Sequence, residues 1–232
     1  MSTEIESWRV RSFVLRAGRI SSAQKRSYQT LFPLFGQKAD ESGVIDFEQL
    51  FGNPNPVVIE IGFGMGTATA AIAEKNPGIN YLGIDVHRPG IGRLLWEIES
   101  RELKNIRIIE GDAVAFLEKR ISDSRVSAFH IFFPDPWPKK RHHKRRLITR
   151  PFTDVLALKL VPGGYVYMVS DWVEYGEWAL KELSATPGLV NKYPLFAKHQ
   201  EWRPQTEFER KGIKKNHETR ELFFLKAQWS IR

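Results

Sequence analysis

The sequence predicts an α/β fold, in which a mostly parallel sheet carries helices on both faces. Two observations indicate this fold class. Short apolar runs alternate with helical stretches from residue 57 onward, which is typical of βαβ units and a parallel sheet. A glycine turn also joins the first apolar run to the first of these helices. With 232 residues and a hydrophobic share of 42%, the chain can form one domain with a substantial core.

The elements are expected in a regular order along the chain. Five buried strands are predicted where short ranges are dominated by apolar residues: 57–61, 80–84, 106–109, 128–133 and 165–169. The stretches around and between them predict helices at 67–75, 90–103, 113–120, 152–160 and 175–183. Two later β-rich segments, 190–196 and 222–227, predict a terminal hairpin pair.

Residues 1–35 differ from the rest and are expected to form a partly ordered basic arm, before a single domain over 36–232. The arm has six Lys or Arg residues against two acids, and its apolar periodicity is weak. No signal-peptide pattern and no apolar run near the ~20 residues of a membrane span are present. Cysteine is absent, which excludes thiolate metal sites and fits a reducing compartment. We therefore expect a cytoplasmic protein with no membrane partner.

The positive charge of the chain is concentrated in one place. The formal net charge is +8, and without the six cations of 139–146 it falls to +2. A nearly neutral domain with one basic segment indicates a localised anionic partner, and nucleic acid is the leading candidate. A membrane surface is disfavoured because prolines precede this segment and it lacks the pattern of an amphipathic helix.

The residues before this basic segment favour a nucleobase over a plain solvated loop. An apolar strand ends at Asp135, which Pro134 and Pro136 bracket, and Trp137 follows. Each proline fixes its own φ and restricts the preceding residue, so the acid and the ring are held on a stiff backbone. A rigid acid and a flat ring beside cations suit a base whose backbone phosphates are held nearby.

The glycine turn carries acids that distinguish between possible ligands. Gly62, Gly64 and Gly66 follow a strand and open a helix, as they also would in an NAD-binding domain. Glu60 would repel a pyrophosphate but suits a sulfonium and an amino group. Asp85 ends the second strand, where it can accept from ribose hydroxyls. Asp112 ends the third strand, where it can accept from an adenine amino group.

At these residues the chain resembles the class I S-adenosylmethionine-dependent methyltransferases. With the 132–146 motif added, it resembles the bacterial tRNA (guanine-N7)-methyltransferases over nearly its whole length, including residues 11–19, 83–90, 170–172 and 203–209. The resemblance implies a Rossmann-like, mostly parallel seven-stranded sheet with an antiparallel C-terminal strand. It also implies transfer of the methyl group of S-adenosylmethionine to N7 of guanosine 46 in the variable loop of tRNA, with S-adenosylhomocysteine as product and no metal. Asp85 stands where the family often has Glu, and either residue accepts from ribose hydroxyls.

The resemblance also implies which residues form the site. Asp135 would be catalytic, holding the base or stabilising its developing positive charge rather than accepting a proton. The cofactor would contact Glu60, Gly62, Gly64, Gly66, Asp85, Asp112 and Asp135. The tRNA would contact Lys139, Arg141, His142, His143, Lys144, Arg145, Arg146, Asp171, Thr206, Glu207, Phe208 and Glu209.

Several alternatives stay open at the level of sequence. Trp137 either stacks on the substrate or packs beneath the basic loop, and Arg16 and Arg19 of the arm either contact tRNA or stay solvated. Thr206 either contacts substrate or caps a helix, with Glu209 completing a capping box. The chain is a monomer or a homodimer with no obligate protein partner. Competing functions are an NAD-dependent oxidoreductase, a non-enzymatic RNA-binding protein on this fold, and a methyltransferase for another RNA or another base atom.

Overall fold

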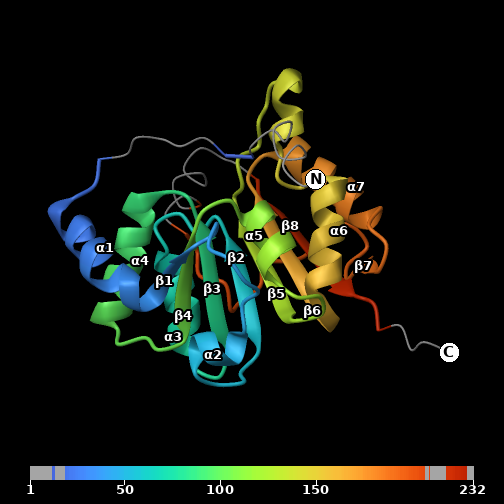
Figure 1. Ribbon diagram of the computed structural model, residues 1–232. Coiled ribbons are helices and arrows are strands. Elements are labelled where there is room, and N and C mark those ends of the chain that lie inside the picture. The colour runs from blue at the N-terminus through green and yellow to red at the C-terminus, as the bar shows by residue number, and fades with distance from the viewer. Residues whose placement is uncertain (1–11, 14–18, 207–208, 210–217, 229–232) are drawn as a thin grey trace, which may run out of the picture.

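The structure, a computed structural model, describes residues 12–13, 19–206, 209 and 218–228. One mixed sheet of eight strands forms the centre of this part of the chain. The spatial order of its strands is β1-β4-β3-β2-β5-β6-β8-β7 (Figure 1). The strands are β1 (Gly36–Lys38), β2 (Val57–Ile61), β3 (Asn80–Asp85), β4 (Ile106–Glu110), β5 (Val126–Phe132), β6 (Leu160–Ser170), β7 (Leu189–Asn191) and β8 (Arg220–Lys226). All neighbours from β1 to β6 pair in parallel, and β8 pairs antiparallel with both β6 and β7.

The strand order changes direction between β2 and β5. From β2 the chain moves outward through β3 to β4, and it then returns to place β5 on the other side of β2. In open α/β sheets, ligands bind beyond the carboxyl ends of the strands at such a switch point. The glycine turn follows β2 and the Pro-Asp-Pro motif follows β5, so the fold brings these two motifs to the same crevice.

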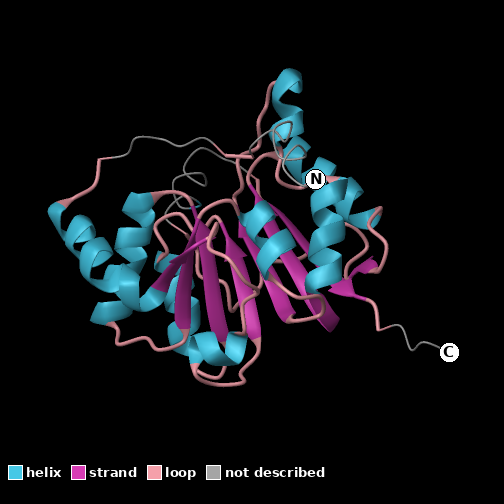
Figure 2. Ribbon diagram, viewed as in Figure 1, coloured by secondary structure: helices cyan, strands magenta, loops and turns pink. Residues whose placement is uncertain are grey.

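Helices cover both faces of the sheet, as Figure 2 shows. They are α1 (Ser22–Phe35), α2 (Phe47–Phe51), α3 (Thr67–Lys75), α4 (Arg88–Ser100), α5 (Ala113–Arg120), α6 (Arg150–Lys159) and α7 (Val173–Ser184), with a 3₁₀ helix, η1 (Lys140–Arg145). One buried apolar cluster joins the sheet to α5, α6 and α7, and a second joins it to α3 and α4. Alternate residues of β2 face the two clusters: Ile59 belongs to the first and Val58 to the second.

The strands and helices expected from residue 57 onward are confirmed with shifted ends, except that the segment expected at 190–196 forms only the three-residue strand Leu189–Asn191. The sheet differs from the expected seven strands because Gly36–Lys38 adds β1 beside β4. Three residues with no apolar alternation carry too little pattern to predict a strand. Helices α2 and η1 were not expected either. No helix among the described residues is long and apolar enough to cross a membrane.

The N-terminal region contains more structure than the expected basic arm. Residues 22–35 form α1, and a capping box between Ser21 and Gln24 stabilises its N-terminus. Tyr28 and Phe32 of this helix pack against the second apolar cluster. The Tyr28 hydroxyl also donates to Glu110 at the end of β4. This helix is therefore part of the packed structure. Residues 1–11 and 14–18, including Arg16, lie outside the described residues.

Candidate functional site

The glycine turn adopts backbone angles that only glycine takes up easily. Gly62, Gly64 and Gly66 have φ values of 75°, 58° and 69°. A Cβ on Gly66 would lie 2.6 Å from the Cβ of Leu94, so this glycine lets α3 pack against α4. At Gly62 and Gly64 a Cβ would meet no atom within 4 Å. The outer side of the turn is therefore open, which leaves room for a ligand against the backbone.

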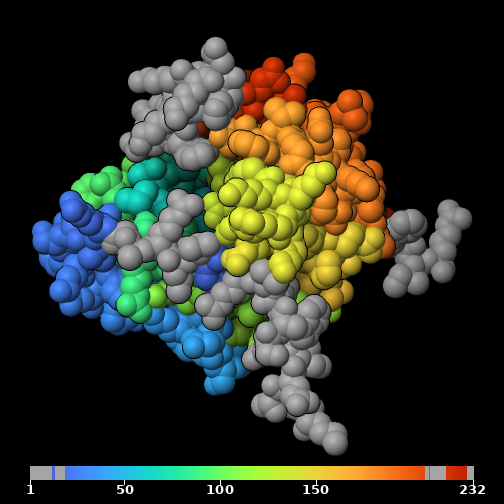
Figure 3. Space-filling view, turned by 90° about the horizontal axis from the view of Figure 1, so that it is seen from above, coloured from blue at the N-terminus to red at the C-terminus, as the bar shows by residue number. Residues whose placement is uncertain are grey.

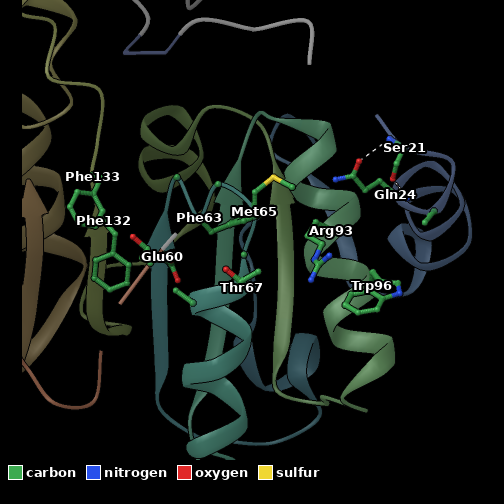
Figure 4. Close-up of a pocket in the computed structure, with 16 residues that line it drawn as sticks. Ser21, Gln24, Glu60, Phe63, Met65, Thr67, Arg93, Trp96, Phe132 and Phe133 are labelled. Carbon is green, nitrogen blue, oxygen red and sulfur yellow. Dashed lines mark hydrogen bonds between the residues drawn. The ribbon is translucent and has the colours of Figure 1, made fainter. Parts of the chain in front are cut away.

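Two cavities lie on either side of this turn and share Gly62, Gly64 and Phe133. The larger, of about 660 Å³, is lined by Glu60, Phe132 and Thr206, and extends to the start of α1 and to Arg93 and Trp96 of α4 (Figure 4). The smaller, of about 370 Å³, is lined by Asp85, Gly111, Ala113 and Asp135, among others. The site predicted from the sequence is thus a connected crevice over the carboxyl ends of β2, β3, β4 and β5.

Glu60 is a buried acid without a hydrogen bond at one of its oxygens. Its side chain is on β2 and is 3% exposed, and Oε2 has no partner among the described residues. Burial raises the pKa of Glu60 to about 7, the Thr69 side chain opposes this shift, and the charge of Asp85 adds to it. A buried, unpartnered carboxylate oxygen at the wall of a cavity is suited to receive a cationic group.

Asp85 holds the glycine turn in place. Its Oδ2 accepts from the backbone N–H of Gly64 at 2.9 Å, and its Oδ1 accepts from Val86 and His87 at 2.7 and 2.9 Å. Burial raises the pKa of Asp85, and these backbone donors act to lower it. Asp112 caps α5, because its Oδ1 accepts from the Val114 N–H at 2.8 Å. Both acids therefore stabilise the loops on which the smaller cavity is built.

Asp135 sits at the rim of the smaller cavity on an unusual stretch of backbone. It is exposed, and Pro134 and Pro136 flank it. Phe133 and Trp137, on either side of these prolines, have φ values of 52° and 47°, in the left-handed region that aromatic residues rarely adopt. Such conformations persist only where surrounding contacts over-determine them, and they cluster at functional sites. The acid is thus held in a fixed place where β5 meets the crevice.

The basic segment forms a ridge beside Asp135, drawn in yellow in the view from above the strand ends (Figure 3). Lys139, Lys140, Arg141 and Lys144 are exposed there. The Arg145 guanidinium lies 5.1 Å from the ring centre of Trp137, and the indole Nε1 donates to the Ser12 carbonyl at 3.2 Å. These contacts favour the packing alternative for Trp137. Loss of hydration and the neighbouring cations lower the pKa of His142.

Arg146 differs from the other cations of the segment. It is 2% exposed and forms an ion pair with Glu174 of α7. His143 contributes a second contact, its Nε2 lying 3.0 Å from Nη2 of Arg146. Its guanidinium is enclosed by protein and does not face the solvent, which argues against the tRNA contact predicted for Arg146.

Glu209 is also enclosed, and the capping alternative is confirmed. The Glu209 N–H donates to Oγ1 of Thr206 at 3.0 Å, and the Thr206 N–H donates to Oε2 of Glu209 at 3.3 Å. Arg203 binds both Glu209 carboxylate oxygens at 2.8 Å. Both carboxylate oxygens of Glu209 have partners inside the protein, which argues against the substrate contact predicted for it. Thr206 does line the larger cavity, Asp171 is half-buried after β6, and Glu207 and Phe208 lie outside the described residues.

Arg203 is a residue that sequence reasoning missed. Its Nη2 lies 2.8 Å from Glu209, 2.9 Å from Glu221 and 3.1 Å from Nδ1 of His199. These three partners also lie close enough together to hold a metal ion, but the guanidinium already stands between them. It is 5.9 Å from the ring of Phe132, which lines the larger cavity. Only the 203–209 motif hinted at this residue, and no spacing indicated its buried partners.

The matching family model and the similar sequences agree on one kind of protein. The family model described as "Putative methyltransferase" matches residues 54–222. The tRNA (guanine-N(7)-)-methyltransferase of Nitrosospira multiformis is 46% identical over 220 residues, covering 94% of this chain and 95% of the relative. A protein of the same description from Treponema pallidum (strain Nichols) is 46% identical over 245 residues, covering 94% and 96%.

Comparison with solved structures supports the fold alone, because sequence identity is low. The 16S rRNA methyltransferase KamB has a TM-score of 0.59 at 16% identity, with 79% of this chain and 94% of that chain covered. The aminoglycoside resistance methyltransferase NpmB1 has a TM-score of 0.53 at 14% identity, covering 78% and 91%. Both likenesses agree with a Rossmann-like methyltransferase fold for the described residues.

Proposed function

Because the chain belongs to the tRNA (guanine-N(7)-)-methyltransferases, we propose that it methylates N7 of the variable-loop guanosine, position 46 in standard tRNA numbering. Membership of the family establishes S-adenosylmethionine-dependent methylation of guanine N7 in tRNA. The nucleotide and the residues that act on it are the proposal. The observation that carries it is the rigid Asp135, placed between the cofactor crevice and the basic ridge.

The crevice fits S-adenosylmethionine. Glu60 offers an unpartnered buried oxygen to the ammonium group of the methionine end. The open side of Gly62 and Gly64 leaves space along the turn. Asp85 and the neighbours of Asp112 line the smaller cavity, where ribose and adenine would lie. Bound there, the cofactor supplies a methyl group that its sulfonium already activates.

The residues then need to align the guanine rather than to deprotonate it. N7 of guanine carries a free lone pair, so no general base is required. Alignment of the attacking nitrogen with the methyl carbon and sulfur is mainly a proximity effect. As the reaction proceeds, positive charge moves onto the purine, and the Asp135 carboxylate would stabilise it. Thr206, at the wall of the larger cavity, and Asp171 would contact the guanosine edge.

The exposed part of the basic ridge would bind the tRNA backbone. Lys139, Lys140, Arg141 and Lys144 present their charges to the solvent beside Asp135. Phosphate contacts of this kind release counterions, so each one makes binding more dependent on salt. We assign the ridge without Arg146 to this role. Arg19 of the N-terminal region is exposed as well and would be a weaker contact.

A tRNA with 7-deazaguanosine in the variable loop tests the proposed atom. This base has a carbon in place of N7 and keeps its Watson–Crick edge. We expect the modified tRNA to accept no methyl group there and to inhibit the unmodified tRNA competitively, because binding depends on the remaining contacts. Methylation of the modified tRNA at the wild-type rate would overturn the assignment of N7 at this position.

Replacing Glu60 with glutamine should weaken cofactor binding and remove its dependence on pH near 7. Loss of a charge-assisted bond predicts a Kd for S-adenosylhomocysteine raised by about 10- to 100-fold. In the wild type, burial raises the pKa of this carboxyl to about 7. Affinity should therefore rise as the pH increases from 6 to 8, because the charged form binds the ammonium.

Isothermal titration at several pH values measures both effects. Glu118→Gln, on the outer surface of α5, is the matched control and should leave the affinity and its pH profile unchanged. The stability of the cofactor-free wild type should follow the opposite trend. The pKa of Glu60 in the folded protein is above its usual value of 4.5, so the free energy of unfolding should fall as the pH rises from about 4.5 to 7. A Glu60→Gln protein that keeps wild-type affinity at every pH would remove Glu60 from the cofactor site.

A further inference from the structure

We propose that Arg146 is a positioning residue of the methyl transfer: it fixes the Asp135 loop against α7 and does not bind tRNA phosphates. The inference rests on the role proposed above for Asp135. The cations of the basic segment 139–146 differ in their exposure. Four cations of the segment are exposed, whereas the Arg146 side chain has no exposed surface.

The first contact of Arg146 is with the loop that carries Asp135. Its Nε donates to the carbonyl of Pro136, the residue that directly follows Asp135, at 3.0 Å. The loop around this bond is strained, since Phe133 and Trp137 both have positive φ. Prolines have no N–H, so neither Pro134 nor Pro136 can donate a backbone hydrogen bond within the loop. An external donor at the Pro136 carbonyl is therefore well placed to hold the conformation.

The second set of contacts is with α7. Nη1 donates to Oε1 of Glu174 at 3.0 Å, and Nη2 donates to Oε2 of the same carboxylate. The guanidinium carbon lies 5.1 Å from the ring centre of Tyr175 and 5.0 Å from that of Trp178. A planar guanidinium that forks onto a carboxylate and packs on two rings is fixed in orientation as well as in place.

These two sets of contacts connect both ends of the proposed substrate site. Helix α7 begins at Val173, two residues after Asp171 at the end of β6. Arg146 therefore ties the loop after β5, which carries Asp135, to the element that follows Asp171. It therefore fixes the Asp135 loop relative to the start of α7. A phosphate could bind this guanidinium only if its contacts with Glu174 and with both rings were broken first.

The distinction can be measured because positioning and phosphate binding change different kinetic constants. Arg146→Lys keeps the charge but loses the fork and the Nε donor. We expect kcat to fall by about 10- to 100-fold, since misplacement of about 1 Å costs that much, while the KM for tRNA stays within about threefold. The salt dependence of KM should be unchanged. Arg141→Gln should instead raise KM and flatten its salt dependence by about one contact.

Two controls separate positioning from a general loss of structure. Arg150→Lys makes the same change at an exposed arginine that pairs with Asp154 on α6, and it should leave kcat and KM as in the wild type. Glu174→Gln leaves Arg146 in place but weakens its anchor, and a fall in kcat of about 3- to 10-fold is expected. Cofactor affinity measured on each variant reports whether the crevice is still folded.

The double variant Asp135→Asn/Arg146→Lys tests whether Arg146 acts through Asp135. If Arg146 acts through Asp135, the double variant should turn over no more slowly than Asp135→Asn alone. Full additivity of the two losses would overturn the inference, as would an Arg146→Lys protein with a raised KM and a flattened salt dependence. Failure of the proposed function is a separate result: Asp135→Asn alone would then keep wild-type turnover.

Discussion

Asp135→Asn is expected to lower kcat by about 10²- to 10³-fold, the usual loss when one preorganised electrostatic group of a transition state is removed. The substitution keeps the shape of the side chain and removes its charge. The charge is needed only as the purine becomes positive, so the KM for tRNA should change much less than kcat. Cofactor affinity should change least, because Glu60 and Asp85 remain.

Single-turnover methyl transfer with enzyme in excess measures this loss without interference from product release. Asp40→Asn, at an exposed turn after β1, is the control and should behave as the wild type. The rate of Asp135→Asn should also show the same pH dependence as the wild type, since no proton is taken from N7. A wild-type rate in Asp135→Asn, or a change confined to KM, would show that Asp135 does not stabilise the transition state.

Arg203→Met is expected to reduce the free energy of unfolding by about 3–5 kcal/mol, the usual loss when one partner of a buried ion pair is removed. Arg203, Glu209 and Glu221 are 1%, 7% and 4% exposed, and both acids bind the same guanidinium. Without it, two carboxylates would be left buried and close together. Tyr167 would still donate to Glu221, but it carries no charge to offset them.

Urea unfolding followed by tryptophan fluorescence measures this change. Arg150→Met removes an exposed pair with Asp154 and should lose less than about 1 kcal/mol. The pH dependence of the wild type provides a second reading. Burial raises the pKa of Glu209, but its bonds to Arg203 hold it below its usual value. The stabilisation is therefore present above about pH 4.5 and lost as the pH falls further. A loss below 1 kcal/mol for Arg203→Met would show that the cluster contributes little.

Periodicity in the sequence was sufficient to predict the central part of the fold. Val57–Ile61 and Ile106–Glu110 are short apolar strands, and Asp112 before an apolar helical stretch is a recognisable helix start. Periodicity did not predict α1, whose contacts with α4 depend on tertiary packing. The close approach of Gly92 to the backbone of Gln24 is an example, since neither residue signals it alone.

The site could be predicted as a set of residues but not as a set of roles. Glycines and acids at strand ends converge wherever a parallel sheet forms, so Glu60, Asp85 and Asp135 were accessible from the sequence. In contrast, the sequence alone predicts that every cation of a basic run is exposed. Arg146 is separated from Glu174 by 28 positions, and no local sequence pattern indicates that the two residues pair. The same holds for Arg203 and Glu221, which are 18 positions apart.

Methylation of one guanosine at one atom is tested most directly by analysis of the product. Unmodified tRNA transcript would be incubated with labelled S-adenosylmethionine, digested, and separated for nucleoside mass spectrometry, with a transcript lacking the variable-loop guanosine in parallel. We expect 7-methylguanosine from the first transcript and none from the second. Label in another nucleoside, or 7-methylguanosine from both transcripts, would contradict the proposed site.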